Sequence, residues 1–274
     1  MFVDGWEYYN HAAIPTCAPH EMPDLTPINN GNIWKIGGGT PLLARWTTEW
    51  DCGYETNWWY VIKDTPFDIS TLKAKRRYEI NKGNKNFDVR IINPVEAIKD
   101  IYRVTIAAYS EWPKKYRPTT TREEIANSVK SWGGYRVFGA YLRETDVLYG
   151  YAIVIEHEKY VSFSVLRVDP EAERLGINAA IVSNILKAYD NRLHDRFYIC
   201  DGERTIRHET AFQDYLEKYF NFRKAYCRVH VEYRGGMRFA VKILFPFRRI
   251  IKGYSRIGNK LQAILKMEEI VRQK

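Results

Sequence analysis

The chain has 274 residues, of which 45% are hydrophobic and 27% charged, the usage of a folded globular protein rather than a disordered one. No run of about 18 apolar residues occurs, so the sequence predicts no membrane-spanning helix. The four cysteines form no Cys-x-x-Cys pair, which argues against a zinc ribbon and a disulfide scaffold.

The formal net charge of +9 is concentrated in two segments. Residues 71–90 contain seven Lys or Arg against two acidic residues, and residues 236–274 contain ten against two. Such segments indicate an anionic partner, either a membrane surface or a nucleic acid such as tRNA, although a solvated amphipathic helix has the same composition. The first residues lack the charged-then-apolar order of a signal peptide. The expected location is therefore the cytoplasm, and contact with a membrane surface through the basic tail is one of the alternatives.

Residues 1–86 are expected to form a strand-rich N-terminal region. The aromatic segments 42–50 and 56–63 predict two strands joined as a hairpin. A helix is predicted from Asp68 or Ser70 to about Asn81, with Gly83 ending it.

Residues 87–235 show the most informative order of elements. A strand at 87–92 is followed by a helix from Pro94 and by a second helix that begins with a capping box, Thr121 to Glu124. Strands at 135–142, 147–156 and 160–168 are separated by turns short enough for antiparallel hairpins. A helix at 176–190, a short strand at 197–200, a helix at 210–220 and a strand at 222–233 complete the region.

Residues 236–274 are expected to form a basic tail that contains an amphipathic helix, with Leu261 and Ile264 on its apolar stripe. Taken together, the elements predict an α+β fold. Its sheet is mixed and mostly antiparallel, and it is flanked by helices on both faces.

The element order over 87–233 resembles the GNAT superfamily of N-acyltransferases. Val168-Asp169-Pro170-Glu171 is similar to the Val-x-Pro-Glu sequence that precedes that family's pyrophosphate loop, and residues 215–223 are similar to its Tyr-Glu-Lys-x-Gly-Phe helix end. The resemblance implies that an acyl-CoA donor lies between two splayed parallel strands, here 160–168 and 197–200. It also implies a pyrophosphate held by amides at the start of the next helix, where free N–H groups and the helix dipole favour anions.

The resemblance assigns the acetyl-CoA contacts to two segments. The strand residues would polarise the acyl carbonyl, and the loop residues would hold the pyrophosphate; together they are Ser164, Leu166, Val168, Arg174, Gly176, Ile177 and Asn178. The family's loop pattern is Arg/Gln-x-x-Gly-x-Gly/Ala. In this sequence Gly176 matches it, Arg174 stands one position out of register, and Asn178 replaces the final small residue.

A second resemblance covers residues 68–92. The segment 70–83 is similar to the Ser-x-Lys-x-Arg-x-x-Ile-x-Lys-Gly helix of Fem-type peptidyltransferases, which take their acyl group from aminoacyl-tRNA. This resemblance implies that residues 1–86 are a reduced, GNAT-like portion in front of the main domain.

Acyl transfer to an amine needs a base, oxyanion donors and an acid that protonates the leaving group. By resemblance the acid is Tyr215, with Tyr219 as the alternate. Asp201 and Glu203 follow the strand at 197–200 in a predicted tight turn, where ligands of α/β folds usually bind, and they are the candidate bases. His208 is a further candidate base.

Three functions are consistent with these residues. The first is a GNAT-type N-acetyltransferase that uses acetyl-CoA and an amine acceptor, such as an amino sugar or a cell-envelope precursor. The second is a Fem-like transferase that uses charged tRNA, and the third is a non-catalytic GNAT-like protein that binds a glycan or another partner. No metal site is expected, because the sequence contains no metal-spaced His pair.

Overall fold

The computed structural model describes residues 3–114, 117–193, 196–206, 211–251 and 256–272. The chain divides into two compact units, each built from more than one stretch. Unit 1 contains residues 1–61, 203–211 and 224–274, and unit 2 contains residues 62–202 and 212–223. Whether 1–86, 87–235 and 236–274 are separate evolutionary domains stays a prediction.

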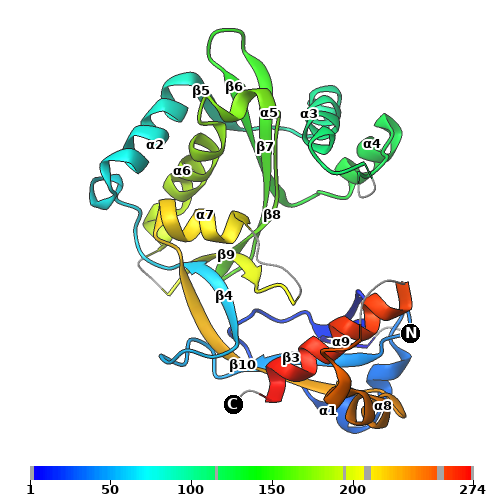
Figure 1. Ribbon diagram of the computed structural model, residues 1–274. Helices are drawn as coiled ribbons and strands as arrows, with labels where there is room; N and C mark the ends of the chain where they lie inside the picture. The colour runs from blue at the N-terminus through cyan, green and yellow to red at the C-terminus, as the bar shows by residue number, and fades with distance from the viewer. Residues whose placement is uncertain (1–2, 115–116, 194–195, 207–210, 252–255, 273–274) are drawn as a thin grey trace. The chain divides into compact units, whose positions relative to one another are not determined.

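Unit 2 is built on a sheet with the strand order β9-β8-β7-β6-β5. Its neighbouring strands pair antiparallel, except β8 and β9, which pair parallel. Figure 1 shows α2 and α6 on one side of these strands and α3 and α4 on the other. This arrangement confirms the mixed, mostly antiparallel sheet with helices on both faces. The elements are α2 (Ala74–Asn86), β5 (Phe87–Ile91), α3 (Ile98–Ser110), α4 (Arg122–Lys130), β6 (Tyr135–Leu142), β7 (Val147–Glu156), β8 (Tyr160–Val168), α5 (Pro170–Glu173), α6 (Ile177–Tyr189), β9 (Tyr198–Glu203) and α7 (Ala211–Phe220).

One core of unit 2 lies between the sheet and the helices α3 and α4. Val104 of α3 and Val129 of α4 meet Leu148 and Ile153 of β7 there, all nearly excluded from solvent. The predicted capping box begins α4, because the Thr121 side chain accepts from the Glu124 amide and the Glu124 carboxylate accepts from the Thr121 amide. Apolar periodicity therefore located α4 and β7, whereas the helix predicted from Pro94 begins four residues later, at Ile98.

On the other face, α2 packs closely against α6 at two glycines. A Cβ on Gly83 would lie 2.3 Å from the Gly176 carbonyl oxygen and 3.0 Å from the Ala180 amide nitrogen. The prediction that Gly83 ends the helix is therefore wrong, since α2 continues to Asn86 and Gly83 is the contact point. Only a residue without a side chain permits this approach.

Unit 1 contains a sheet with the strand order β1-β2-β3-β10-β4. Strand β10 pairs antiparallel with β3, with His230 opposite Trp46, and lies between β3 and β4. The predicted hairpin of 42–50 with 56–63 is therefore wrong, because a distant segment supplies the strand between them. The strands are β1 (Trp6–Tyr9), β2 (Ala12–Pro15), β3 (Leu43–Thr48), β4 (Trp58–Lys63) and β10 (Arg223–Tyr233).

The C-terminal segment belongs to unit 1. It contains α8 (Met237–Leu244), the 3₁₀ turn η4 (Phe245–Phe247) and α9 (Arg256–Arg272). Leu265 and Met267 of α9 are almost fully buried in clusters with residues of β3, β4 and β10. The sequence did not predict α8. Within the described residues, no helix combines the length and apolar content that crossing a bilayer requires.

Candidate functional site

The parallel strands β8 and β9 of unit 2 pair over a short length and then separate. Tyr160 pairs with Tyr198, Val161 with Ile199 and Ser162 with Cys200. The pairing ends there, although β8 continues to Val168 and β9 to Glu203. Beyond Ser162, β8 has no pairing with β9, and backbone groups that leave a ladder need other hydrogen-bond partners.

A β-bulge lies on β8 at the same level. On β7, Val154 pairs with Phe163 and Ile153 with Val165, so Ser164 has no opposite residue. A bulge re-aims the backbone of its strand and often occurs beside an active site. Ser164 is exposed, while Leu166 and Val168 are half-buried. The structure therefore places the three predicted strand residues on the segment where β8 leaves β9.

Asp201 is the first residue of β9 beyond the paired segment. Burial raises the pKa of its carboxyl to about 7, and a hydrogen bond with the Gln213 side chain partly opposes this shift. The group is therefore partly ionised near neutral pH, as a general base or acid requires. Residues 201–203 are strand, so the predicted tight turn at 201–204 is wrong.

Gln213 is the partner that the sequence analysis missed. It lies on α7 and is only 8% exposed, among apolar neighbours such as Leu216 and Phe220. A buried amide normally has a specific hydrogen-bond partner, and here that partner is Asp201. The signal in the sequence was a polar residue within the apolar stripe of a helix.

Tyr215 lies one helical turn from the start of α7, in an aromatic environment. Its ring centroid is 4.8 Å from that of Tyr219 and 5.6 Å from that of Phe220. Burial raises the pKa of its hydroxyl, and Tyr219 and Glu79 add to the effect, so the phenol stays protonated at neutral pH. A role for Tyr215 as the acid stays a prediction. His208 lies outside the described residues.

The start of α6 is closed by α2. Gly176 has a left-handed φ of 85° and is buried, and its amide donates to the Glu173 carbonyl oxygen at 2.9 Å. Ile177 is fully buried, whereas Asn178 is half-buried and Arg174 is exposed. A pyrophosphate bound in the family's manner would need this backbone to be open. The Gly176 amide is therefore not free to donate to a pyrophosphate as the chain is packed here.

Glu203 belongs to unit 1, although it is only two residues after Asp201. Its carboxylate forms an ion pair with Arg45 and accepts a hydrogen bond from the Tyr60 hydroxyl at 3.4 Å. The Arg45 guanidinium also lies 4.9 Å from the ring centre of Trp58, which is 1% exposed. Glu203 is therefore engaged in a partly buried ion pair.

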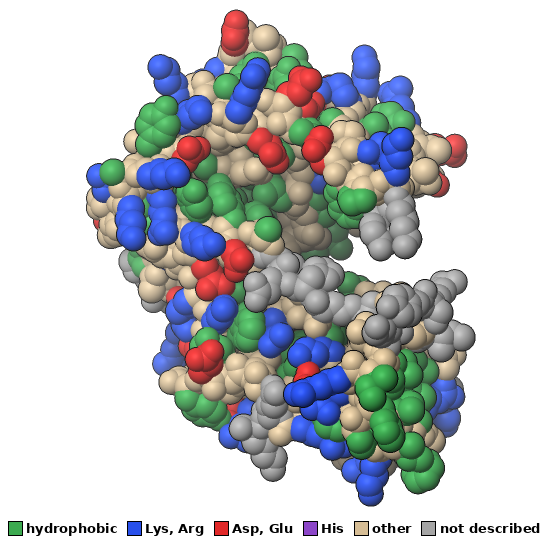
Figure 2. Space-filling view, in the orientation of Figure 1, with side chains coloured by type: hydrophobic (Ala, Val, Ile, Leu, Met, Phe, Trp, Pro, Cys, Tyr) green, Lys and Arg blue, Asp and Glu red, His purple; other side chains and the backbone are tan. Residues whose placement is uncertain are grey.

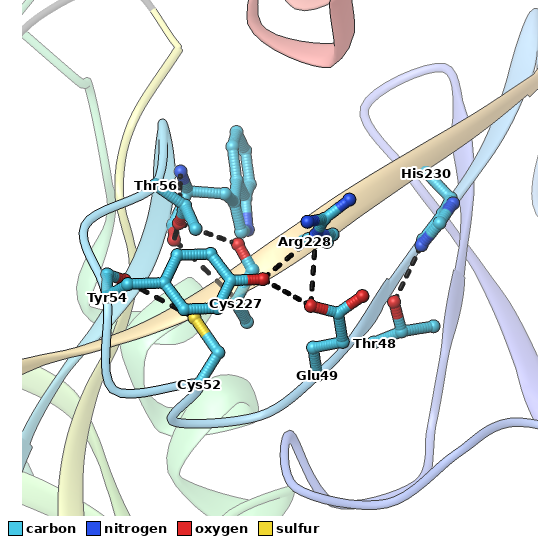
Figure 3. Close-up of polar contacts among 9 residues, drawn as sticks. Thr48, Glu49, Cys52, Tyr54, Thr56, Cys227, Arg228 and His230 are labelled. Atoms are coloured by element: carbon cyan, nitrogen blue, oxygen red, sulfur yellow. Dashed lines mark hydrogen bonds and ion pairs between the residues drawn. The ribbon is translucent and has the colours of Figure 1, made fainter. Parts of the chain in front are cut away.

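A second polar cluster of unit 1 joins the loop between β3 and β4 to β10 (Figure 3). Arg228 bonds the Glu49 carboxylate and the Tyr54 hydroxyl, and these two also bond each other. Thr48 is 2.7 Å from Nε2 of His230, whose pKa is lowered by burial. The charged groups of this cluster satisfy one another, so its effect is to hold the loop in place. Across the described part of the chain, no group of three or more His, Cys, Asp or Glu side chains could hold a metal ion.

The strand order, the β8 bulge and the separation of β8 from β9 define a GNAT-like fold. Comparison with protein-family models finds no matching model, and comparison with curated proteins finds no relative. Among solved structures, the chain is similar to L-PGS from Bacillus licheniformis, with 12% identity and a TM-score of 0.53, over 89% of this chain and 84% of that one.

A second solved structure is the C-terminal DUF2156 domain of a protein from Agrobacterium fabrum described as a lysylphosphatidylglycerol synthetase. It is 12% identical, with a TM-score of 0.51, and the match covers 93% of this chain and 89% of that one. At this level of identity, both likenesses establish the fold alone.

Proposed function

We propose that this chain is a GNAT-like transferase that moves an aminoacyl group from an ester donor to an amine or hydroxyl acceptor. The observation that carries the proposal is Asp201, a carboxyl with a pKa of about 7 at the point where β8 and β9 separate. A base of this pKa is about half ionised at neutral pH, so it can both accept and return a proton there.

The reaction needs two contributions from unit 2. The Asp201 carboxylate takes a proton from the acceptor, whose nitrogen or oxygen then attacks the carbonyl carbon of the ester. Backbone N–H groups of β8 near Ser164 stabilise the oxyanion that forms. The bond between the carbonyl carbon and the ribose oxygen then breaks, and the proton held by Asp201 is returned to that oxygen.

The packing of the α6 start favours an aminoacyl ester over acetyl-CoA as the donor. The amide of Gly176 is already bonded within the chain, and its Cα side lies against α2, so one of the donors that the family offers to the pyrophosphate of CoA is occupied. In contrast, Lys75, Arg77 and Lys85 of α2 are exposed to solvent, as is Lys73 directly before it. A basic helix of this kind supports binding to a nucleic-acid backbone. The name lysylphosphatidylglycerol synthetase, given to a solved structure of similar fold, contains an aminoacyl group, which supports the choice of an aminoacyl over an acetyl group.

The test uses purified protein, tRNA charged with radiolabelled amino acids, and three acceptor classes: amino sugars, simple amines and phosphatidylglycerol vesicles. We expect label to move to one acceptor class with wild-type protein and with Asp88→Asn, a control on an exposed carboxylate that pairs with Arg90. Asp201→Asn should retain donor binding but lose transfer by at least about a hundredfold.

Acetyl-CoA, the donor predicted from the sequence, is examined in parallel by thermal denaturation. A ligand at about a hundred times its dissociation constant adds roughly 2.7 kcal/mol to stability, so binding would raise the midpoint by a few degrees. A clear shift with acetyl-CoA and no retention of charged tRNA on a filter would refute the proposed donor. Full activity of Asp201→Asn would refute the proposed base.

A further inference from the structure

The helix α8 and the turn after it carry a stripe of exposed apolar side chains. Phe239 is 70% exposed, Ile243 49%, Phe247 55% and Ile250 74%. Phe239 and Ile243, four residues apart, share one side of α8, and Phe247 and Ile250 follow in η4 and in the turn after it. Scattered exposed apolar residues are normal, but a contiguous row of large ones marks an interaction surface.

The opposite side of α8 is fixed in the core of unit 1. Val241 is 1% exposed, and Met237, Leu244 and Phe245 pack on the same cluster, together with Tyr233 of β10. Rotating α8 to bury Phe239 and Ile243 would expose these residues instead. The exposed stripe is therefore a fixed feature of the folded unit.

Basic side chains run beside the apolar stripe. Arg238, Lys242 and Arg249 are exposed; the first two, four residues apart, share one side of α8, and Arg249 lies in the turn after η4. Residues 236–251 contain four Lys or Arg and no Asp or Glu. Figure 2 shows hydrophobic side chains gathered where Figure 1 places α8, with Lys and Arg side chains at the border.

We propose that this α8–η4 surface, formed by Phe239, Ile243, Phe247, Ile250 and the cations beside them, docks the protein on an anionic lipid membrane. Large apolar side chains on one face and cations next to them are what an interfacial helix needs, because the former enter the acyl boundary while the latter meet the headgroups. The charge selects an anionic partner. The aliphatic side chains Ile243 and Ile250 select lipid over nucleic acid, since only aromatic ones can stack on bases.

The α8–η4 surface takes no part in the proposed transfer reaction. Vesicle binding can therefore be absent while transfer is observed, and transfer can be absent while vesicles are bound. The test is sedimentation of the full chain with vesicles of phosphatidylcholine alone or with about one third phosphatidylglycerol. Asp201→Asn should bind vesicles as the wild type does.

Two variants separate the apolar and electrostatic contributions. Phe239→Ser with Ile243→Ser removes apolar contacts, and Lys242→Glu with Arg249→Glu reverses two charges. Each pair should weaken binding to anionic vesicles by at least about tenfold. Only the charge pair should reduce the salt sensitivity of binding. The replaced side chains are exposed, so far-UV circular dichroism and the melting temperature should stay unchanged.

Met22→Ser is the matched control, because Met22 is a large apolar residue of unit 1 that is 62% exposed outside this surface. It should bind vesicles like the wild type. If the double variant Phe239→Ser, Ile243→Ser bound anionic vesicles as tightly as the wild type, the proposal would be overturned. Binding of the wild type to RNA but not to vesicles would also overturn it. The same holds if the wild type is a dimer in size-exclusion chromatography and the double variant Phe239→Ser, Ile243→Ser is a monomer.

Discussion

Replacement of Asp201 by asparagine is expected to stabilise the protein above neutral pH while it abolishes transfer. The pKa of this carboxyl is about 7 in the folded protein, against an ordinary value of 3.8, because burial disfavours its charged form. Removing the ionisable group removes the free energy needed to ionise it in a buried position. Asparagine keeps the size of the side chain and its ability to bond the Gln213 amide.

The magnitude follows from proton linkage. Below about pH 4 the Asp201 carboxyl is protonated in both the folded and the unfolded chain, so it lowers the free energy of unfolding only slightly. Between about pH 4 and pH 7 the unfolded chain releases the proton while the folded chain retains it, and stability falls. Above about pH 7 both are ionised, and the loss levels off at an order of 4 kcal/mol, from about 1.4 kcal/mol for each tenfold difference in acid constant.

The assay is urea denaturation followed by far-UV circular dichroism, for wild type and Asp201→Asn at several pH values from 4 to 8. The difference in unfolding free energy should grow in favour of the variant by about 3 kcal/mol across this range. For the exposed control Asp88→Asn the difference should stay within about 0.5 kcal/mol. If the unfolding free energies of Asp201→Asn and the wild type changed with pH in the same way, burial would not raise the pKa of this carboxyl. The assignment of Asp201 as the base would then be refuted.

The remaining predictions concern packing, an ion pair and a helix cap. Gly83→Ala should lower the unfolding free energy by about 2 kcal/mol, because the added Cβ overlaps the Gly176 carbonyl oxygen. An increase of about 1 kcal/mol, which helix propensity alone would give, would contradict that contact. Arg45→Met should lower the free energy of unfolding in urea by about 3 kcal/mol, because it leaves the Glu203 carboxylate without its cation. A decrease below about 0.5 kcal/mol would mean that the ion pair is exposed to solvent. Thr121→Ala should reduce hydrogen-exchange protection in the first turn of α4 by about 1 kcal/mol, and unchanged protection would mean that the capping box contributes nothing.

Local sequence patterns determined most of unit 2. Alternating and helical periodicities gave β5 to β8 and α6 nearly to the residue, because each buries one face of an element against a single core. The capping box at Thr121 was readable for the same reason, since its two bonds join residues three apart in the chain. Asp201 could be named as a candidate base from its place after a buried strand.

Only the tertiary structure decided the features that depend on distant segments. The insertion of β10 between β3 and β4, the contact of Gly83 with Gly176 and the ion pair of Arg45 with Glu203 each join residues far apart in the chain. The raised pKa of Asp201 likewise needs the burial of its carboxyl in the folded chain, which the Gln213 hydrogen bond only partly opposes. A sequence pattern reports which face of an element is buried, whereas pairing order and desolvation arise from which other element covers that face.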